Sequence, residues 1–231
     1  KELGALSILL TFDLDNNNQL TGTIPEEYEG LQSMVFLGLE NSQISGTIPE
    51  FLGNLSELVF IYLFKAQFSG TIPSNLANIP HIRYIRVEDN FLIGSIPESF
   101  GNLSELIVLS VNNNFLRGTI PSSLSMLSKL EELAVQNNQL SGPIVGIFNH
   151  TVQSSLFDID LSNNRFSGEL PGEVFLLPKL STFVCVSSCL RGKIPAEICN
   201  NESEVSTIIL DSLHGSTNCP FHSVFDTNAL F

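Results

Sequence analysis

Residues 103–121 read LSELIVLSVNNNFLRGTIP, and this stretch of sequence decides the fold. From Leu106 onward its apolar residues follow the frame L-x-x-L-x-L-x-x-N-x-L, and the stretch ends with Gly118, Ile120 and Pro121. The central L-x-L alternates with a period of two, which predicts a short strand that buries one face and exposes the residues between. Glycine permits a positive φ, and proline fixes φ without donating a hydrogen bond. The final segment therefore predicts a turn away from that strand.

This pattern recurs along the chain with a period of 24 residues. The glycines of the turn motif are Gly22, Gly46, Gly70, Gly94, Gly118, Gly142, Gly168 and Gly192, and only the step from Gly142 to Gly168 is longer, at 26 residues. A fixed period of this length predicts a solenoid in which stacked repeats bury one continuous core, with one strand per repeat in a parallel sheet. We expect the side-chain amides at the strand ends to form a ladder that satisfies unpaired backbone groups, at Asn90, Asn114, Asn138 and Asn164.

The strand frame followed by G-x-I-P resembles the leucine-rich repeat family, and the G-x-I-P signature is similar to its plant-type subclass. The resemblance covers residues 3–213 and implies an α/β-type leucine-rich repeat solenoid. Such a solenoid is a curved right-handed superhelix with a parallel β-sheet on its concave face. Short second strands, turns and 3-10 or other helical segments form the convex side. The resemblance implies no chemistry, because a fold does not fix a function.

The repeat pattern also predicts how the chain is divided. We expect residues 1–213 to form the leucine-rich repeat domain, with about nine repeats of which the first is incomplete, so that the sequence is a fragment. Residues 214–231 lose the frame and are expected to be an irregular segment, either a cap or an insertion before further repeats. The longer repeat has Pro143-Ile144 in place of its I-P turn, and we expect residues 145–155, which follow, to bulge from the convex side. Three repeats replace the ladder asparagine, with Ser42, Ala66 and Ser188, and the ladder should be weakest near Ala66.

The composition argues against several classes of function. The 231 residues include 10 basic and 24 acidic side chains, and the formal charge of −14 argues against nucleic acid and anionic membrane surfaces as partners. No apolar run approaches the ~20 residues of a membrane-spanning helix, so we expect no direct membrane insertion by this segment. The sequence lacks the motifs of serine hydrolases, zinc proteases, nucleotide-binding loops and kinases. We therefore predict a protein that is not an enzyme and uses no cofactor.

Two acidic stretches have part of the spacing of a chemical site. Residues 13–17 match the beginning of a calcium loop, but Asn18 stands where that loop needs glycine and no glutamate closes it. Asp158 and Asp160 fall on one strand face and could act as paired carboxylates, but nothing in the sequence indicates a pocket around them. We predict no metal site and no catalytic site from these residues.

The residues that flank the strand leucines are expected to form the concave surface. Toward the N-terminal end these candidates are aromatic or basic, namely Phe36, Phe60, Tyr62, Phe64, Lys65, Tyr84 and Arg86. Further along they are acidic, namely Glu88, Glu132, Asp158 and Asp160. Apolar side chains at solvent positions of a sheet are typical of an interaction surface, so these residues are the predicted ligand site. The alternative is that the rings only pair across neighbouring strands.

Each group of this predicted site has an expected role. The anchors are Phe60, Tyr62 and Phe64. Arg86 and Lys65 are expected to pair anionic groups of the ligand. Asp158 and Asp160 are expected to attract a basic segment.

Two kinds of covalent modification are also candidates. Four sequons occur, at Asn54, Asn102, Asn149 and Asn201, although chance alone yields a similar number in a chain so rich in Asn, Ser and Thr. All four cysteines lie near the C-terminus, and Cys185 occupies a strand-leucine position where a small buried side chain is expected. We expect a disulfide between Cys199 and Cys219, with Cys189 as a further candidate. The weaker alternative is a zinc site formed by Cys199, Cys219, His214 and His222.

The resemblance to plant-type repeats implies a function in recognition. Such repeats form the ectodomains of receptor-like kinases and receptor-like proteins, and also polygalacturonase-inhibiting proteins. All of these use the concave face to bind peptides, glycans or proteins. We therefore predict a non-catalytic, extracellular or cell-surface module with a protein, peptide or glycan ligand and a co-receptor, whose signal peptide lies outside this sequence. The alternatives are a secreted inhibitor of a cell-wall hydrolase, a structural or ice-binding solenoid, and a cytosolic protein-interaction scaffold.

Overall fold

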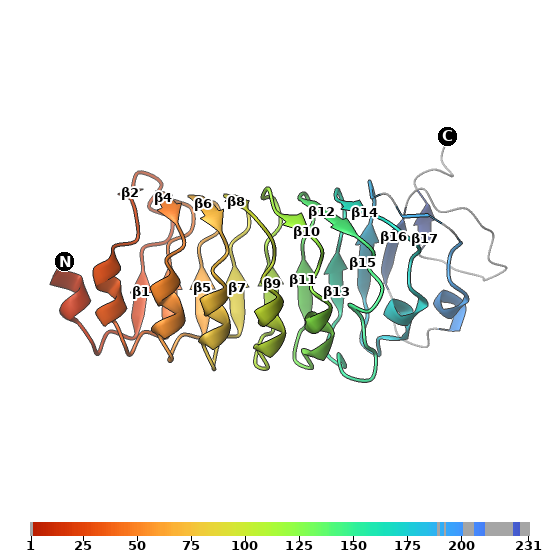
Figure 1. Cartoon of the computed structure of the whole chain (residues 1–231), viewed down its shortest axis with the longest axis horizontal. Coiled ribbons are helices and arrows are strands. Elements are labelled where there is room, and N and C mark those ends of the chain that lie inside the picture. Colours follow the sequence, from red (N-terminus) through yellow and green to blue (C-terminus); the bar gives the residue numbers. More distant parts are fainter. Residues whose placement is uncertain (1, 189, 192, 201–205, 211–223, 227–231) are drawn as a thin grey trace.

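The computed structural model describes residues 2–188, 190–191, 193–200, 206–210 and 224–226. Figure 1 shows successive turns of the chain stacked side by side along the long axis of the molecule. Most turns contribute one strand to a long sheet, a second short strand and a 3-10 helix. The predicted leucine-rich repeat solenoid is confirmed.

The main sheet has ten strands, their spatial order follows the sequence, and every neighbouring pair is parallel. The strands are β1 (Thr11–Asp13), β3 (Phe36–Gly38), β5 (Phe60–Tyr62), β7 (Tyr84–Arg86), β9 (Val108–Ser110), β11 (Glu132–Ala134), β13 (Asp158–Asp160), β15 (Thr182–Cys185), β16 (Thr207–Leu210) and β17 (Val224–Asp226). In β1 to β13 the central side chain is always buried, as the period-two alternation predicts. Strand β17 lies inside residues 214–231, so the strand ladder continues into the segment expected to be irregular.

The turn motifs form two smaller parallel sheets beside the main sheet, which confirms the expected second strands. Their strands are β2 (Thr21–Gly22), β4 (Gln43–Thr47), β6 (Gln67–Thr71), β8 (Phe91–Ile93), β10 (Arg117–Gly118), β12 (Gln139–Gly142) and β14 (Arg165–Phe166). The motif glycine has a left-handed backbone, with φ of 76° at Gly70, which explains why the motif needs glycine at this point.

The chain also forms short 3-10 helices, all of which except η1 follow a motif proline. They are η1 (Glu2–Ala5), η2 (Glu26–Gly30), η3 (Glu50–Asn54), η4 (Ser74–Asn78), η5 (Glu98–Asn102), η6 (Ser122–Met126), η7 (Gly172–Leu176) and η8 (Ala196–Asn200). A side chain at Gly53 in η3 would collide with the backbone oxygen of Asn75 in η4, so glycine allows neighbouring helices to approach closely. In the described part of the chain, no helix is long and apolar enough to cross a membrane.

The buried side chains form one continuous cluster that runs from Phe12 in β1 to Leu210 in β16. Cys185 belongs to this cluster with 1% of its surface exposed, which confirms the expectation of a small buried side chain. The core is continuous because each strand buries only one or two residues. A single turn therefore cannot form a core without its neighbours.

The asparagine ladder is confirmed and connects successive turns. Asn114 is buried, and its side-chain amide donates to the backbone oxygens of Val87 (3.0 Å), Val111 (3.1 Å) and Asn112 (3.1 Å). Its side-chain oxygen accepts from the backbone N–H of Leu92 (2.9 Å). Val87 and Leu92 belong to the preceding turn, so one side chain satisfies backbone groups of two turns. Equivalent bonds are made by Asn90, Asn138 and Asn164.

A serine compensates for the gap in this ladder at Ala66. An asparagine at position 66 would bond the backbone oxygen of Leu39 and the N–H of Ile44, by analogy with Asn90. The hydroxyl of Ser42 makes both bonds instead, donating to Leu39 O (2.7 Å) and accepting from Ile44 N (3.3 Å). The expected weakness near Ala66 is therefore covered from the neighbouring turn.

Residues 143–155 replace the 3-10 helix of the seventh repeat with a series of turns. The segment is anchored rather than loose, because Ile144, Ile147 and Phe148 are buried in the common core. Gln153 is also buried, and its amide donates to Leu124 O (3.1 Å) while its side-chain oxygen accepts from Asn149 N (2.7 Å). The bond to Leu124 ties the irregular segment to the preceding turn, and the bond from Asn149 closes the segment on itself.

The Ser42 bridge makes a testable prediction about stability. Ser42→Ala should lower the free energy of unfolding by about 1 to 3 kcal/mol, because it leaves a buried backbone carbonyl and N–H without a partner. Adding Ala66→Asn to this variant should restore most of the loss, since the new amide reaches the same two groups. Urea denaturation followed by circular dichroism measures both differences. A double variant less stable than Ser42→Ala alone would contradict this account of the ladder.

Candidate functional site

The solvent-facing side of the main sheet, called the sheet face below, corresponds to the predicted concave surface. Five rings on this face contact one another and form the aromatic cluster, which consists of Phe36, Phe60, Tyr62, Phe64 and Tyr84. Phe60 stacks on Tyr84 with ring centres 4.9 Å apart, and Phe36 meets Tyr62 edge to face at 5.3 Å. All five rings are half-buried. The aromatic candidates from the sequence are thus brought together in one patch.

The register of the sheet explains the cluster. Phe36, Phe60 and Tyr84 are direct partners in the neighbouring strands β3, β5 and β7, so their rings lie side by side. Gly38 leaves room for the first ring, because a Cβ at that position would lie 2.6 Å from Cε1 of Phe36. The cross-strand pairing that was the alternative explanation is therefore present. It does not remove the patch from solvent, because the ring surfaces remain partly exposed.

Arg86 connects the aromatic cluster to the acidic part of the sheet face. Its guanidinium lies 4.9 Å from the ring centre of Phe64 and 5.8 Å from that of Tyr62, a cation–π arrangement. The same group forms an ion pair with Glu88, with Nη2 and Oε1 2.9 Å apart. The charge of Arg86 is therefore already balanced inside the protein. Arg86 and Lys65 are the two residues expected to bind anionic groups of the ligand. Of these two, the exposed Lys65 is the one that can still do so.

Next to Arg86 the sheet face is hollowed over strands β7 to β11. This acidic hollow has a volume of about 320 Å³, and its lining includes Phe64, Glu88, Asn112, Glu132 and Gln136. Glu88 is 6% exposed, while Glu132 is half-buried. Ser110 and Ala134 form part of its lining, and their side chains are small. The predicted candidates Glu88 and Glu132 therefore line one hollow, whereas Asp158 and Asp160 lie on the next strand, β13.

Several buried polar atoms of the sheet face have no hydrogen-bond partner among the described residues. They are Oε2 of Glu40, Nε of Arg86, Oε2 of Glu88 and Oε1 of Gln136. A buried polar atom without a partner costs about 1 to 3 kcal/mol, and native proteins leave few of them. Three of the four belong to residues that line the acidic hollow. A bound molecule could satisfy these atoms at no further desolvation cost to the protein. Sequence reasoning placed Gln136 on the concave face but missed Glu40, and it found neither unpaired atom, because a side chain's hydrogen-bond partners depend on its rotamer.

Burial and neighbouring carboxylates make ionisation of the acidic residues on this part of the sheet face less favourable. Burial raises the pKa of Glu88 and of Glu132, and the nearby Arg86 opposes both shifts. Glu132 pairs in register with Asp158, so two carboxylates face each other across neighbouring strands, and Asp158 further raises the pKa of Glu132. Burial and then Asp160 raise the pKa of Asp158. Glu132, Asp158 and Asp160, called the acidic row below, therefore hold negative charge that Arg86 compensates only in part.

The remaining acidic and cysteine candidates form no further site in the described residues. Asp13 lies on β1, and no group of three or more potential metal ligands is found in the described part of the chain. Asn201, Cys189, Cys219, His214 and His222 lie outside the described residues. Cys199 lies in η8, but its side chain is outside the described set. The disulfide and the zinc alternative therefore stay predictions.

The three sequons in the described part of the chain differ in accessibility. Asn54 and Asn102 are exposed at the ends of η3 and η5, and the Asn54 amide donates to Oε1 of Glu29 (2.9 Å). Asn149 is half-buried, and its side-chain oxygen accepts from the N–H (3.1 Å) and hydroxyl (2.7 Å) of Thr151. Asn54 and Asn102 are thus the more accessible acceptors, and glycosylation stays a prediction.

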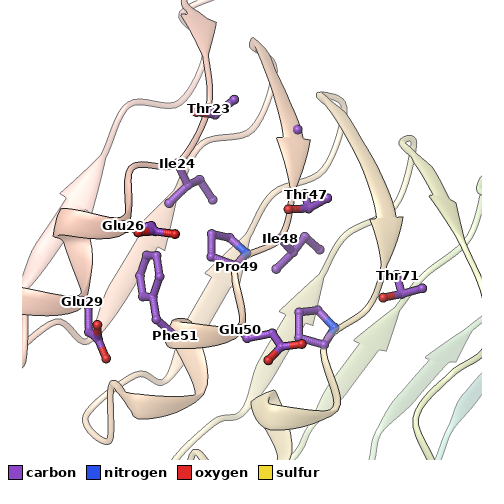
Figure 2. Close-up of a pocket in the computed structure, with 12 residues that line it drawn as sticks. Thr23, Ile24, Glu26, Glu29, Thr47, Ile48, Pro49, Glu50, Phe51 and Thr71 are labelled. Atoms are coloured by element: carbon purple, nitrogen blue, oxygen red, sulfur yellow. The ribbon is translucent and has the colours of Figure 1, made fainter.

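A second surface lies beside the smaller sheets, where Figure 2 shows Thr23, Thr47 and Thr71 one turn apart. They border a hollow of about 900 Å³ together with Glu26 and Glu50. In each of five repeats, the residue that directly follows the motif glycine is exposed. Together these residues form the threonine row, which consists of Thr23, Thr47, Thr71, Ser95 and Thr119. Sequence reasoning did not single out these residues, although the variable position x of the G-x-I-P motif is Thr or Ser in five consecutive repeats.

The acidic row makes a testable prediction about pH. The pKa of Glu132 is raised by folding, so its ionisation destabilises the folded chain once the pH passes that raised value. Glu132→Gln should therefore stabilise the chain at pH 7 by no more than about 1 kcal/mol, because the half-exposed group is screened by water. The gain should vanish below about pH 4, where the carboxyl is protonated in both states. Urea midpoints at both pH values, with the exposed Glu173→Gln as a control, test this. A loss of stability at pH 7 would contradict it.

Comparisons with known proteins agree with this architecture. Two leucine-rich repeat models match the chain, over residues 80–140 and 155–177. No curated protein matches the sequence. A similar solved structure is the ectodomain of the membrane receptor kinase GASSHO1/SCHENGEN3 from Arabidopsis thaliana in complex with CASPARIAN STRIP INTEGRITY FACTOR 2. It has 34% identity and a TM-score of 0.86, and the match covers 92% of this chain and 25% of that chain.

Two further structures show the range of the similarity. The Arabidopsis receptor kinase HAESA, in complex with the peptide hormone IDA and the co-receptor SERK1, has 31% identity and a TM-score of 0.83, covering 91% of this chain and 35% of that one. A plant ice-binding protein has 26% identity and a TM-score of 0.69, covering 97% of this chain and 78% of that one. The chain thus spans about a quarter to a third of the two receptor structures. With the 24-residue period and the parallel strands, these matches show that the chain is a leucine-rich repeat protein of the plant type.

Proposed function

We propose that this chain is a non-catalytic, extracellular peptide-recognition module that binds its ligand on the sheet face. The observation that carries this proposal is the position of the unpaired buried polar atoms beside the aromatic cluster on one open face. The receptor kinases that it resembles are recorded in complex with CASPARIAN STRIP INTEGRITY FACTOR 2 and with the peptide hormone IDA, which supports a peptide as the ligand.

The geometry suits recognition by a rigid surface. The rings of the aromatic cluster are held by parallel strands in fixed register, so little side-chain freedom is lost when a ligand binds. The half-buried aromatic rings supply contact area. The unpaired oxygens of the acidic hollow accept hydrogen bonds that would fix the orientation of the ligand. A peptide offers apolar side chains and hydrogen-bond donors together, whereas a glycan lacks the cationic groups that the acidic row favours.

The proposed module would act as part of a receptor-like protein or receptor kinase at the cell surface. A co-receptor is a reasonable second partner, because the HAESA complex contains one. A secreted inhibitor of a cell-wall hydrolase would use the same face. The sheet face is therefore the surface to test, whichever longer protein carries this chain.

The aromatic cluster gives the first functional test. Peptides selected from a displayed random library against the chain should bind Tyr62→Ala/Phe64→Ala at least about tenfold more weakly, since each buried ring contributes more than 1 kcal/mol. The matched control is Phe91→Ala/Phe115→Ala, which removes an exposed stacked ring pair from the smaller sheets. Dissociation constants come from isothermal titration calorimetry, and circular dichroism verifies folding. Equal effects of the two double variants would remove the sheet face from consideration.

A second candidate function is ice binding, and the threonine row favours it. The match to the plant ice-binding protein covers 78% of that chain, far more than the match to either receptor. Successive turns stack at the ~4.8 Å spacing of the main sheet, so the row presents a hydroxyl group, and at each threonine a methyl group, at a regular short interval. Each methyl is also held in place, because Cγ2 of Thr47 lies only 2.9 Å from the position that a Cβ of Gly70 would occupy. A regular, ordered row of this kind could hold ordered water.

Thermal hysteresis tests this second function directly. If the threonine row binds ice, the chain should lower the freezing point below the melting point. Thr71→Tyr should then abolish most of the effect, because the large ring interrupts the centre of the row. Ser104→Tyr, at an exposed position outside the row, should leave it unchanged. A chain without thermal hysteresis, or equal behaviour of the two variants, excludes ice binding by this surface.

A further inference from the structure

We infer that the ligand of the sheet face is a peptide that carries an arginine or lysine three residues away from an aromatic or large aliphatic residue. The inference rests on the peptide-binding function proposed above and narrows it to one class of sequence. It follows from the chemistry of the acidic hollow, from the aromatic cluster beside it and from the distance between the two.

The acidic hollow has the chemistry of a site for a cationic side chain. Glu88 is 94% buried, yet its Oε2 has no hydrogen-bond partner, and neither has the buried Oε1 of Gln136. Both unpaired oxygens only accept hydrogen bonds, so the group that satisfies them must be a donor. Among the described residues, no basic side chain forms an ion pair with Glu132 or Asp158. Arg86 and Lys65 line the same hollow, but Arg86 is paired with Glu88, so Glu132 and Asp158 favour a donor that also carries a positive charge.

The shape of the hollow favours an organic cation over a metal ion. The described residues contain no group of three potential metal ligands, so the carboxylates do not converge on one point. A guanidinium carries five N–H donors in a plane and can reach several separated acceptors at once. The volume of about 320 Å³ also admits a side chain with its water. Phe64 lines the same hollow and offers an apolar surface to the stem of the side chain.

Two strand spacings separate Tyr84, at one side of the aromatic cluster, from Glu132, at the far side of the hollow. Tyr84, Val108 and Glu132 are direct partners in the neighbouring strands β7, β9 and β11. Strands lie ~4.8 Å apart, so the ring of Tyr84 and the carboxylate of Glu132 are centred roughly 10 Å from each other along the sheet. A polyproline II peptide rises ~3.1 Å per residue and returns to the same side every three residues, which spans ~9.3 Å. A fully extended strand places residues i and i+3 on opposite sides and fits this spacing less well.

The path between the two subsites is open to a peptide backbone. The intervening strand β9 presents Val108, which is half-buried, and Ser110, which is small and buried. Ser110 belongs to the lining of the hollow, and neither side chain rises between Tyr84 and Glu132 as an aromatic or long charged group would. A peptide that lies across the strands can therefore place its apolar side chain on the cluster and its cation in the hollow.

Peptides of defined spacing test the inference. Each is fluorescently labelled, has Gly-Ser flanks and contains Phe-Pro-Pro-Arg, Phe-Pro-Arg, Phe-Pro-Pro-Pro-Arg or Phe-Pro-Pro-Gln. We expect Phe-Pro-Pro-Arg to bind most tightly by fluorescence anisotropy, at least fivefold more tightly than each of the other three. Glu132→Gln should weaken binding of the arginine peptide about fivefold and leave that of the glutamine peptide unchanged. Glu173→Gln, an exposed residue of η7, should change neither.

The outcomes separate this inference from the proposed function. Equal binding of the arginine and glutamine peptides, or tightest binding at another spacing, overturns the inference. The inference is also overturned if the library-selected peptides lack basic residues while their binding depends on Tyr62 and Phe64. That result leaves the proposed function intact. If library selection yields no binder and none of the four peptides binds, both are wrong. Library-selected peptides with a basic residue three positions from an apolar one support both.

Discussion

The hydrogen bonds between successive turns are the interaction on which the rest of this structure depends. A three-residue strand such as β9 buries a single large apolar side chain, which is far too little apolar surface to order a chain by itself. The turn becomes stable only when its backbone is shared with the next one. Asn114 shows how this is done, because its amide bonds the backbone of its own turn and of the preceding turn. This reach fixes where the asparagine of each turn must lie relative to the strand of the preceding turn, also across the longer step to Asn164.

The constant period has a direct consequence for the surface. Residues at equivalent positions of successive turns become neighbours, so every surface feature of the protein is a row. At the first outward position this stacks Phe36, Phe60 and Tyr84, where contact between rings is favourable. At the same position further along it places Glu132 beside Asp158, where contact between charges is unfavourable. One geometric rule thus produces both a stabilising and a destabilising row on the same sheet.

The sequence predicted the solenoid and the membership of the sheet face, because both follow from periodicity. It could not predict which of these side chains already have partners. Arg86 and Glu88 flank Val87 on one strand face, but only the side-chain rotamers show that they pair and that Oε2 of Glu88 is left over. The role of Ser42 as a substitute for an asparagine at position 66 was equally hidden, because it requires the distance between two turns. Residues 143–155 lack the motif, so no pattern indicated that Gln153 would anchor them.

The acidic row is informative because the fold does not require it. In β9 the same outward positions are occupied by Val108 and Ser110, so the repeat accepts neutral side chains there without any change in the strands. A basic residue at either of the paired positions in β11 and β13 would also turn repulsion into attraction across the sheet. The chain instead keeps Glu132, Asp158 and Asp160 together, next to a buried glutamate with an unpaired oxygen. Residues that lower stability where neutral ones would fit are the expected mark of a binding site, since their unfavourable charge is relieved only when a cation arrives.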